Sequence, residues 1–390
     1  MDHWMNSQVK RIGSNVSVCS IATLLLIWLL GLNAIGAESP SLTGVVIEVP
    51  TPPTPIPAEG RHNFLFELHI TNLRSNSLEL NRVEFFAASS SQPAATFDPP
   101  HLDKWIKRHV PIANNRLIEG GHRAMLFVNL SLDRKSLPSS LRLAFQTKEG
   151  ETITEECELP VRRESPISIA PQLHGGNWFA FNCLDNHSHH RLSWFPLAGR
   201  PIVPQRYAID WIKLGPKDKP FQGDWRQVTN YYGYGVNVIA AGNATVTQVR
   251  DGMPDNPPFA VKRGSVSMDA ATGNHVLLRL DSTHYALYAH LKLGSIAVKV
   301  GDRVKTGQVL GRLGNSGSSD LPHLHFHMVG SDSPIFADGV PYVLKSFEWR
   351  GVGNSFDALM EGKGFTKSSG QSPDRRRHEF PANNSVVFFR

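Results

Sequence analysis

The chain is 390 residues long, which exceeds one ordinary hydrophobic core, and typical domain sizes of about 100–200 residues predict two domains. Its composition is that of a globular protein, with 41% hydrophobic and 19% charged residues. The net charge of +6 is dispersed rather than gathered into an aromatic-interleaved basic patch, which argues against nucleic acid as a partner. The 32 Gly and 27 Pro are scattered between short strand-like runs and predict an all-β protein.

The N-terminus has the pattern of an export signal. Lys10 and Arg11 precede residues 12–37, a largely apolar stretch without Asp, Glu, Lys or Arg. Small residues at 36–37 offer a cleavage point, but the stretch is also long enough to anchor the chain in a membrane. We therefore expect residues 1–37 to be a signal peptide or membrane anchor. The remaining chain is expected in the cell envelope, the periplasm or the extracellular space.

Residues 41–165 are expected to form the first domain. Short alternating runs such as 64–71, separated by turn-rich patches, predict an immunoglobulin-like β-sandwich. Its histidines lack carboxylate neighbours at ligand spacing, so we assign this domain no chemistry and expect it to position the second domain or bind an envelope protein partner. Residues 166–174 contain two prolines and no periodicity, and are expected to be the inter-domain linker. For Cys157 and Cys183, a disulfide and two buried free thiols are both expected outcomes.

The second domain, residues 175–350, is also predicted to consist of strands. Its runs 275–280 and 284–291 are separated by an Asp-Ser-Thr turn, which is a hairpin signal. Residues 251–273 form a long insertion without clear periodicity, expected either to overhang a binding cleft or to be a solvated excursion. After this domain, residues 351–390 are expected to be a polar basic tail, solvated or in contact with envelope anions.

Three histidines alternate near the end of the second domain. Side chains at i, i+2 and i+4 of a strand share a face, so His323, His325 and His327 are expected to point the same way. Three imidazoles on one face are hard to explain as packing, whereas imidazole is a good zinc ligand and a catalytic zinc site needs three protein ligands. Asp210 is the best carboxylate candidate, because an unpaired carboxylate between apolar neighbours would be costly.

An ordered set of motifs resembles the lysostaphin-like zinc endopeptidases, which mostly cut cell-wall peptides of peptidoglycan. The motifs are AIDW at 208–211, YAHL at 288–291, VKVGDRVKTGQVLGRLGNSG at 298–317 and PHLHFH at 322–327. The resemblance covers roughly residues 175–350 and implies a β-sheet groove with one zinc ion per chain at its floor. By position it implies that Asp210 and His325 are metal ligands. It also implies that His323 and His290 activate the attacking water and stabilise the oxyanion.

One position departs from this family. Its first ligand is a histidine four residues before the aspartate, where this chain has Arg206, and arginine cannot ligate a metal. Three explanations compete. His190, which directly precedes an arginine in an HR pair resembling that of a divergent branch of the family, replaces the ligand. Alternatively His327 swings in, or the site is degenerate and binds without cutting. His187 and His189 are expected to be loop histidines.

The sequence therefore predicts an exported zinc metalloendopeptidase that hydrolyses peptide bonds, in cell-wall peptidoglycan, by zinc-activated water. The alternative is a non-catalytic envelope protein that uses a degenerate peptidase cleft to bind peptidoglycan or to regulate another hydrolase. Arg206 is the residue that favours this alternative.

Overall fold

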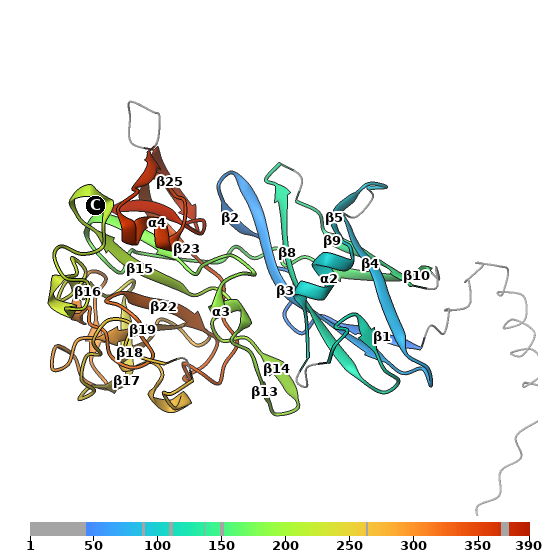
Figure 1. The fold of residues 1–390 in the computed structure, drawn as a ribbon, viewed down its shortest axis with the longest axis horizontal. Helices are drawn as coiled ribbons and strands as arrows, with labels where there is room; N and C mark the ends of the chain where they lie inside the picture. The colour runs from blue at the N-terminus through green and yellow to red at the C-terminus, as the bar shows by residue number, and fades with distance from the viewer. Residues whose placement is uncertain are drawn as a thin grey trace, which may run out of the picture. The chain divides into compact units, whose positions relative to one another are not determined.

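The structure is a computed structural model that describes residues 44–87, 90–108, 112–135, 137–148, 152–262, 264–367 and 374–390. The predicted signal peptide or membrane anchor, residues 1–37, lies outside these ranges. Among the described residues, no helix combines the length and apolar character required to cross a membrane. Strands dominate this part of the chain, so the fold is all-β as predicted (Figure 1).

Two sheets face each other in the first part of the chain. The first has the strand order β1-β3-β8-β6, with β2 also paired to β3, and the second has the order β10-β9-β4-β5, with β7 paired to β4. Their bounds are β1 (Val45–Glu48), β2 (Ile56–Ala58), β3 (Arg61–Asn72), β4 (Leu78–Ala87), β5 (Pro93–Phe97), β6 (Ile106–Lys107), β7 (Leu117–Ile118), β8 (Arg123–Asp133), β9 (Ser140–Thr147) and β10 (Thr152–Pro160), with the helix α2 (Pro99–Trp105) between β5 and β6. Side chains from both sheets share one apolar core. This is a β-sandwich, and its immunoglobulin-like type remains a prediction.

Strand β3 is buried on both of its faces. Phe64 and Phe66 point into the sandwich core, as the period-2 alternation of a strand requires. The side chain between them, Leu65, belongs instead to the core of the large sheet described below. Glu67 and His69 share the face of Leu65 and are also buried. One strand of the sandwich therefore packs directly against the second part of the chain.

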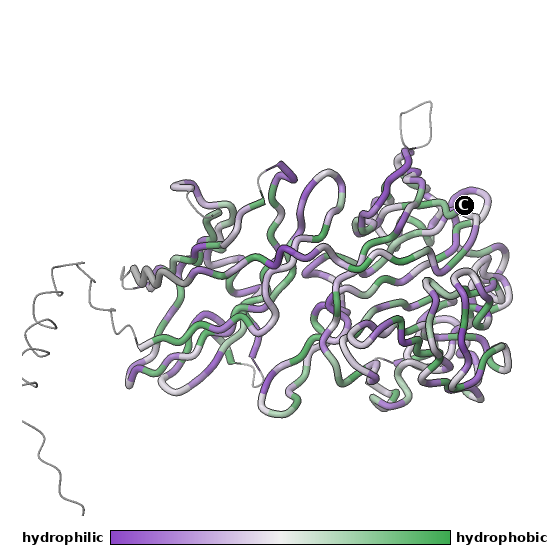
Figure 2. The backbone as a smooth tube through the Cα atoms, turned by 180° about the vertical axis from the view of Figure 1, so that it is seen from behind, coloured by the Kyte–Doolittle hydropathy of each residue, from purple (hydrophilic) through white to green (hydrophobic). Residues whose placement is uncertain are grey.

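The second part is built on one large antiparallel sheet with a single parallel pair at its edge. Its strand order is β11-β23-β26-β12-β15-β22-β19-β18-β17-β20, and β24 and β25 also pair with β23. The bounds are β11 (Ile167–Ile169), β12 (Gly175–Phe181), β15 (Ile209–Leu214), β17 (Ala244–Arg250), β18 (Asn274–Arg279), β19 (Tyr285–Leu291), β20 (Arg303–Val304), β22 (Leu324–Val329), β23 (Tyr342–Gly353), β24 (Phe365–Lys367), β25 (Asp374–Glu379) and β26 (Ser385–Phe389). Apolar stretches run through the strands of this sheet and of the sandwich (Figure 2).

Smaller elements surround the large sheet. They are the strand pairs β13 (Phe195–Leu197) with β14 (Arg200–Ile202) and β16 (Asn237–Ile239) with β21 (Val309–Arg312), the helices α3 (His189–Leu192) and α4 (Phe356–Glu361), and the 3-10 turns η1 (Pro216–Asp218), η2 (Val228–Asn230) and η3 (Met268–Ala270). The predicted hairpin is confirmed, because β18 and β19 pair antiparallel across the Asp-Ser-Thr turn. Cys183 carries a free, buried thiol.

Two expectations are wrong. Residues 351–390 were expected to be a polar tail, but β26 lies between β23 and β12 and forms part of the core. Its apolar residues Val386, Val387 and Phe389 are fully buried. The stretch 166–174, expected to be a linker, contributes β11 to the sheet edge and buries Leu173. Both segments are short apolar runs flanked by polar or proline-rich sequence, which hid their strand character.

Candidate metal centre

Three neighbouring strands bring the predicted site residues together. Asp210 of β15 lies directly opposite His325 of β22, and Ala289 of β19 lies opposite His325 on its other side. The next residue of β19, His290, has a left-handed backbone with φ of 61°. A non-glycine residue holds this conformation only where its surroundings impose it, which is common at functional sites. The register of the sheet thus places Asp210 beside His325 on one side, and on the other side Ala289, which His290 follows.

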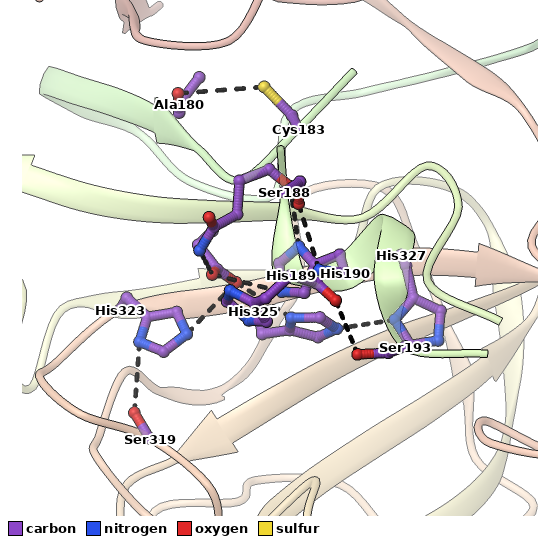
Figure 3. A network of polar contacts seen from close by, with 12 residues as sticks. Ala180, Cys183, Ser188, His189, His190, Ser193, Ser319, His323, His325 and His327 are labelled. Carbon is purple, nitrogen blue, oxygen red and sulfur yellow. Dashed lines mark hydrogen bonds and ion pairs between the residues drawn. The ribbon is translucent and has the colours of Figure 1, made fainter. Parts of the chain in front are cut away.

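Asp210 is the centre of the polar contacts. Its Oδ1 lies 3.0 Å from Nδ1 of His325 and 3.3 Å from Nε2 of His323. Its Oδ2 lies 3.3 Å from Nε2 of His190 and accepts a hydrogen bond of 3.0 Å from Nδ2 of Asn182. Figure 3 shows His190, His323 and His325 close together, with His327 on the far side of His325. An aspartate and three imidazoles therefore surround one point.

His190 reaches Asp210 from the short helix α3. Ser188 caps this helix by accepting a hydrogen bond from the backbone N–H of His190, and its hydroxyl donates to the carbonyl of Asn182. The same carbonyl accepts a hydrogen bond of 2.8 Å from Nδ1 of His190. Because Nδ1 carries the proton, the lone pair of Nε2 faces Asp210, which is the arrangement that a histidine ligand needs.

His290 and His323 lie side by side at the edge of this group, with ring centroids 4.8 Å apart. Nδ1 of His290 donates to the carbonyl of Ser316 at 2.8 Å, and Nδ1 of His323 donates to the carbonyl of Leu321 at 2.8 Å. Each ring is therefore oriented through Nδ1, and Nε2 is its second titratable atom, which in His323 lies 3.3 Å from Oδ1 of Asp210.

Hydrogen bonds that run from the carbonyl of Pro334 through His327 orient the ring of His325. Nε2 of His327 lies 3.1 Å from the carbonyl of Pro334, which can only accept, so this nitrogen donates. Burial lowers the pKa of His327 to about 3, so its ring is neutral and its Nδ1 must accept. That Nδ1 lies 2.7 Å from Nε2 of His325. His325 therefore donates through Nε2 and turns the lone pair of Nδ1 toward Asp210.

Burial disfavours the charged forms of Asp210, His190, His290 and His323, but the nearby opposite charge reverses the direction of the pKa shift for Asp210 and His323. The imidazoles of His190 and His323 outweigh burial and hold the pKa of Asp210 well below its ordinary value. The Asp210 carboxylate likewise outweighs burial at His323 and raises the pKa of that ring. Burial prevails at His190 and His290, whose pKa values lie well below that of an ordinary histidine. An ionised carboxylate beside neutral imidazoles is the state that binds a divalent cation.

The centre lies at the floor of a cleft of about 860 Å³. Aromatic and other apolar side chains line it, including Phe181, Trp194 and Phe356. The insertion 251–273 contributes Phe259, Val261, Met268, Ala271 and Thr272 to the same lining. This insertion therefore overhangs the cleft, which was one of the two expectations for it.

The donor set fits zinc. On tetrahedral zinc, donor atoms about 2.0–2.2 Å from the ion stand roughly 3.3–3.6 Å from one another. The observed separations of 3.0 and 3.3 Å from the Asp210 oxygens to His325 and His190 are close to this. Two donor groups form among the described residues, His290 with His323 and His325, and His189 with His190 and Asp210, each with its atoms within 4.8 Å. Nitrogen and carboxylate oxygen are the ligands that catalytic zinc sites use.

Arg206 lies away from the centre. Its guanidinium binds the carboxylates of Glu67 and Asp338 at 2.7 and 3.3 Å and the carbonyl of Gly339 at 3.2 Å. His327 contacts His325 rather than Asp210, so the structure does not place it as a replacement ligand. His187 contacts Asp185 and Lys104, away from Asp210.

Sequence reasoning missed Asn182 and Ser188. Asn182 hydrogen bonds to both Asp210 and His190, yet nothing in the sequence around it marks this role. Ser188 had a usable signal, because serine before a helix is a preferred N-cap, but α3 is only four residues long and gives no periodic pattern.

An aspartate flanked by histidines on adjacent antiparallel strands, at the floor of a cleft, gives this all-β protein a group of side chains that could hold a metal ion. Residues 231–336 match the family model of Peptidase family M23, so this segment, which contains His290, His323 and His325, belongs to that family. Asp210, His190 and Arg206 precede the matched segment.

Curated relatives agree with this family. The glycyl-glycine endopeptidase ALE-1 of Staphylococcus capitis is 37% identical over 119 residues, which cover 30% of this chain and 31% of the relative. Lysostaphin of Staphylococcus simulans is 45% identical over 74 residues, 18% of this chain and 15% of the relative. The peptidoglycan DD-endopeptidase ShyA of Vibrio cholerae is 31% identical over 103 residues, 26% and 20% of the two chains. The chain thus spans less than a third of the length of each of these relatives.

A solved structure of the lysostaphin catalytic domain from Staphylococcus simulans is 26% identical, with a TM-score of 0.22, and the match covers 37% of this chain and 81% of that one.

Proposed function

We propose that this chain is an exported zinc metalloendopeptidase that hydrolyses peptide bonds of cell-wall peptidoglycan. The observation that carries the proposal is the convergence of His190, Asp210 and His325, with His290 and His323 beside them, at the floor of one cleft. The names of the relatives, a glycyl-glycine endopeptidase and a peptidoglycan DD-endopeptidase, support a peptide of the cell wall as the substrate class. Export follows from the pattern of residues 1–37.

The metal ligands in this proposal are Nε2 of His190, a carboxylate oxygen of Asp210 and Nδ1 of His325. Each of these nitrogens has its lone pair directed by a hydrogen bond at the other ring nitrogen. Zinc, when bound, supplies Lewis-acid chemistry that polarises a carbonyl oxygen and lowers the pKa of a water molecule to about 7.

His290 and His323 perform the proton chemistry. Both rings are fixed through Nδ1 and line the cleft, so Nε2 is the reacting atom in each. Between them they accept the proton of the attacking water, stabilise the oxyanion that develops on the scissile carbonyl, and return the proton to the leaving amine. General acid–base catalysis of this kind contributes typically about 10²–10⁴-fold to the rate.

The apolar lining of the cleft has its own role in the proposal. Phe181, Phe356 and Trp194 line the cleft together with residues of the insertion 251–273, so a bound peptide would lose contact with water on several sides. Exclusion of water strengthens each charge interaction in the cleft.

The test separates metal binding from catalysis. The purified chain is expected to retain about one zinc ion, and His190→Ala and Asp210→Ala are each expected to lose it, since each removes one of three ligands. His323→Ala is expected to keep zinc but to release soluble fragments from purified cell wall at least about a hundredfold more slowly. Zinc retained in both ligand variants would contradict the ligand set, and undiminished release by His323→Ala would contradict its catalytic role.

The non-catalytic alternative rested on a missing ligand at Arg206. His190, beside Asp210, offers a third donor from a different element, so no observation favours a degenerate site. Complete absence of fragment release from cell wall by a zinc-loaded chain would restore that alternative.

A further inference from the structure

We propose that Glu67, on β3 of the N-terminal sandwich, is a positioning residue for the zinc site, because it holds the segment that presents His190. The N-terminal sandwich is then a structural part of the metal centre rather than an independent module. The proposal rests on the zinc site proposed above and names what that site depends on.

Glu67 lies between two arginines of the second part of the chain. Its carboxylate pairs with Arg191, the residue that directly follows His190, and with Nη2 of Arg206 at 2.7 Å. Nε of Arg206 also donates to both Glu67 oxygens, at 3.2 and 3.3 Å. All three side chains are at most 5% exposed. A single buried carboxylate therefore joins the helix of His190 to the strand region of Asp210.

The segment around His190 has further contacts with the sandwich. Arg191 donates through Nη2 to the carbonyl of Phe66 on β3 at 2.8 Å, and Asn186 donates to the carbonyl of Phe127 on β8 at 2.8 Å. Leu192 and Trp194 pack against the sandwich core. His190 is thus flanked on both sides by residues that bind the first domain.

Helix α3 requires such support. It contains four residues, and isolated helices shorter than about 12 residues are marginal in water. Its internal stabilisation is the Ser188 cap, while the ring of His190 must be held within hydrogen-bonding distance of Asp210. The Asn182 carbonyl holds Ser188 and His190 from the side of the large sheet, and the contacts of the flanking residues with the sandwich hold the helix from the other side.

Arg206 connects the Glu67 contact with the position at which this chain lacks the expected first histidine ligand. It occupies the position at which the resemblance expects the first histidine ligand, and its side chain is used instead to bind Glu67 and Asp338. Arginine cannot ligate a metal but forms bidentate pairs with carboxylates. Glu67 therefore binds two arginines: Arg206, which stands where the first histidine ligand is expected, and Arg191, which adjoins the replacement ligand His190. The loss of the first ligand and its replacement by His190 are thus connected through one carboxylate.

The experiment uses the full chain with Glu67→Gln. Zinc affinity is measured by competition with a chelator, and backbone hydrogen exchange of residues 183–194 is measured in the metal-free protein. Because the substitution removes the charge that pairs both buried arginines, we expect zinc affinity to fall by about 10–100-fold, as for other residues that orient ligands. We expect residues 183–194 to exchange faster even without metal, a readout that does not depend on activity.

Glu79→Gln is the matched control. Glu79 is also a buried sandwich glutamate paired with two basic residues, Arg116 and Lys148, but it makes these contacts within the sandwich. Its loss is expected to lower stability without changing zinc affinity. If Glu67→Gln does not fold, Asn186→Ala replaces it, since this change removes the hydrogen bonds to the carbonyl of Phe127 and from Nε of Arg191 but leaves the Glu67 pairs intact. It is expected to weaken zinc binding at the lower end of the same range.

The outcomes distinguish this inference from the proposed function. A wild-type chain that binds no zinc overturns the zinc site itself. A wild-type chain that binds zinc, with Glu67→Gln or its replacement Asn186→Ala binding equally tightly, overturns the positioning role alone. An equal loss of zinc affinity in Glu79→Gln also overturns it, because the effect would then reflect general destabilisation of the sandwich.

Discussion

At the scale of single residues, the metal centre depends on which nitrogen of each ring carries the proton. Backbone carbonyls make this choice for four of the five histidines, namely His190, His290, His323 and His327. His325 is the exception, because it is oriented by another imidazole, His327. A carbonyl cannot donate, so each of these bonds has one direction, and that of His327 is passed on to His325.

The contact between His327 and His325 predicts the effect of a substitution. His327→Ala removes the acceptor for Nε2 of His325, so the ring can adopt the other tautomer or rotate, and zinc affinity is expected to fall by about 10–100-fold. Chelator competition measures the change. His284→Ala, at the exposed hairpin turn where it binds Asp281, is the control and is expected to leave zinc affinity unchanged. Unchanged affinity in His327→Ala would show that zinc alone orients His325.

At the scale of elements, the C-terminal strand is the part that differs most from expectation. β26 pairs with both β12 and β23, and Trp211 of β15 packs edge-on against Phe389 with centroids 5.1 Å apart. The last residues of the chain therefore support the strand that carries Asp210.

This placement predicts a large loss of stability from a terminal substitution. Phe389→Ala removes a fully buried aromatic ring and is expected to lower the free energy of unfolding by about 3–5 kcal/mol. Phe336→Ala, whose side chain is 51% exposed, is the matched control, with an expected change within about 0.5 kcal/mol. Urea unfolding measures both. Equal effects would show that the C-terminal strand does not contribute to the core.

At the scale of the whole molecule, β3 joins the sandwich to the large sheet through both an apolar and a charged contact. Leu65 contributes to the core of the large sheet, and the hydroxyl of Tyr207 donates to its carbonyl at 3.1 Å. Two residues further along, Glu67 pairs with Arg191 and Arg206. His69 follows on the same face, and burial with the charges of Arg123 and Arg206 lowers its pKa to about 4.

The pKa of His69 predicts how stability changes with pH. A folded pKa of about 4, below the ordinary 6.5, means that the unfolded chain binds the proton more strongly. The neutral ring therefore contributes stability above pH 6.5 that is lost as the pH falls from 6.5 toward 4. Between pH 7 and pH 5, the wild-type chain is expected to lose about 2 kcal/mol more unfolding free energy than His69→Gln. Urea unfolding at both pH values measures the difference, and parallel losses in the two proteins would contradict a buried neutral His69.

Much of the centre could be predicted from local sequence. Alternation in PHLHFH placed His323, His325 and His327 on one side, and Asp210 was identified because it stands between apolar strand residues. Three of the four motifs that carry the resemblance lie on β15, β19 and β22, which are neighbours in the sheet, while the fourth, residues 298–317, contains β20 and β21. The order of these motifs along the chain and the alternation of their side chains can both be read from short stretches of sequence. The all-β class and the β18–β19 hairpin were predictable for the same reason.

The rest depended on contacts between residues distant in sequence. His190 was one of several histidines in a polar segment, and only the fold shows that its Nε2 lies 3.3 Å from Oδ2 of Asp210. His189, expected to be a loop histidine, is instead the first residue of α3. β26 could not be recognised, because a short apolar run after a polar stretch gains its partners β12 and β23 only in the folded sheet.

The sequence by itself determined the all-β class and the family match of residues 231–336, and it predicted most of the side chains that lie around Asp210, because strand alternation and motif spacing are local properties of the sequence. Only the tertiary structure decided that His190 stands beside Asp210 and that Arg206 binds Glu67 instead of joining the centre. The physical reason in the case of Arg206 is that a buried guanidinium requires an oppositely charged partner, and that partner, Glu67, lies 139 residues away along the chain.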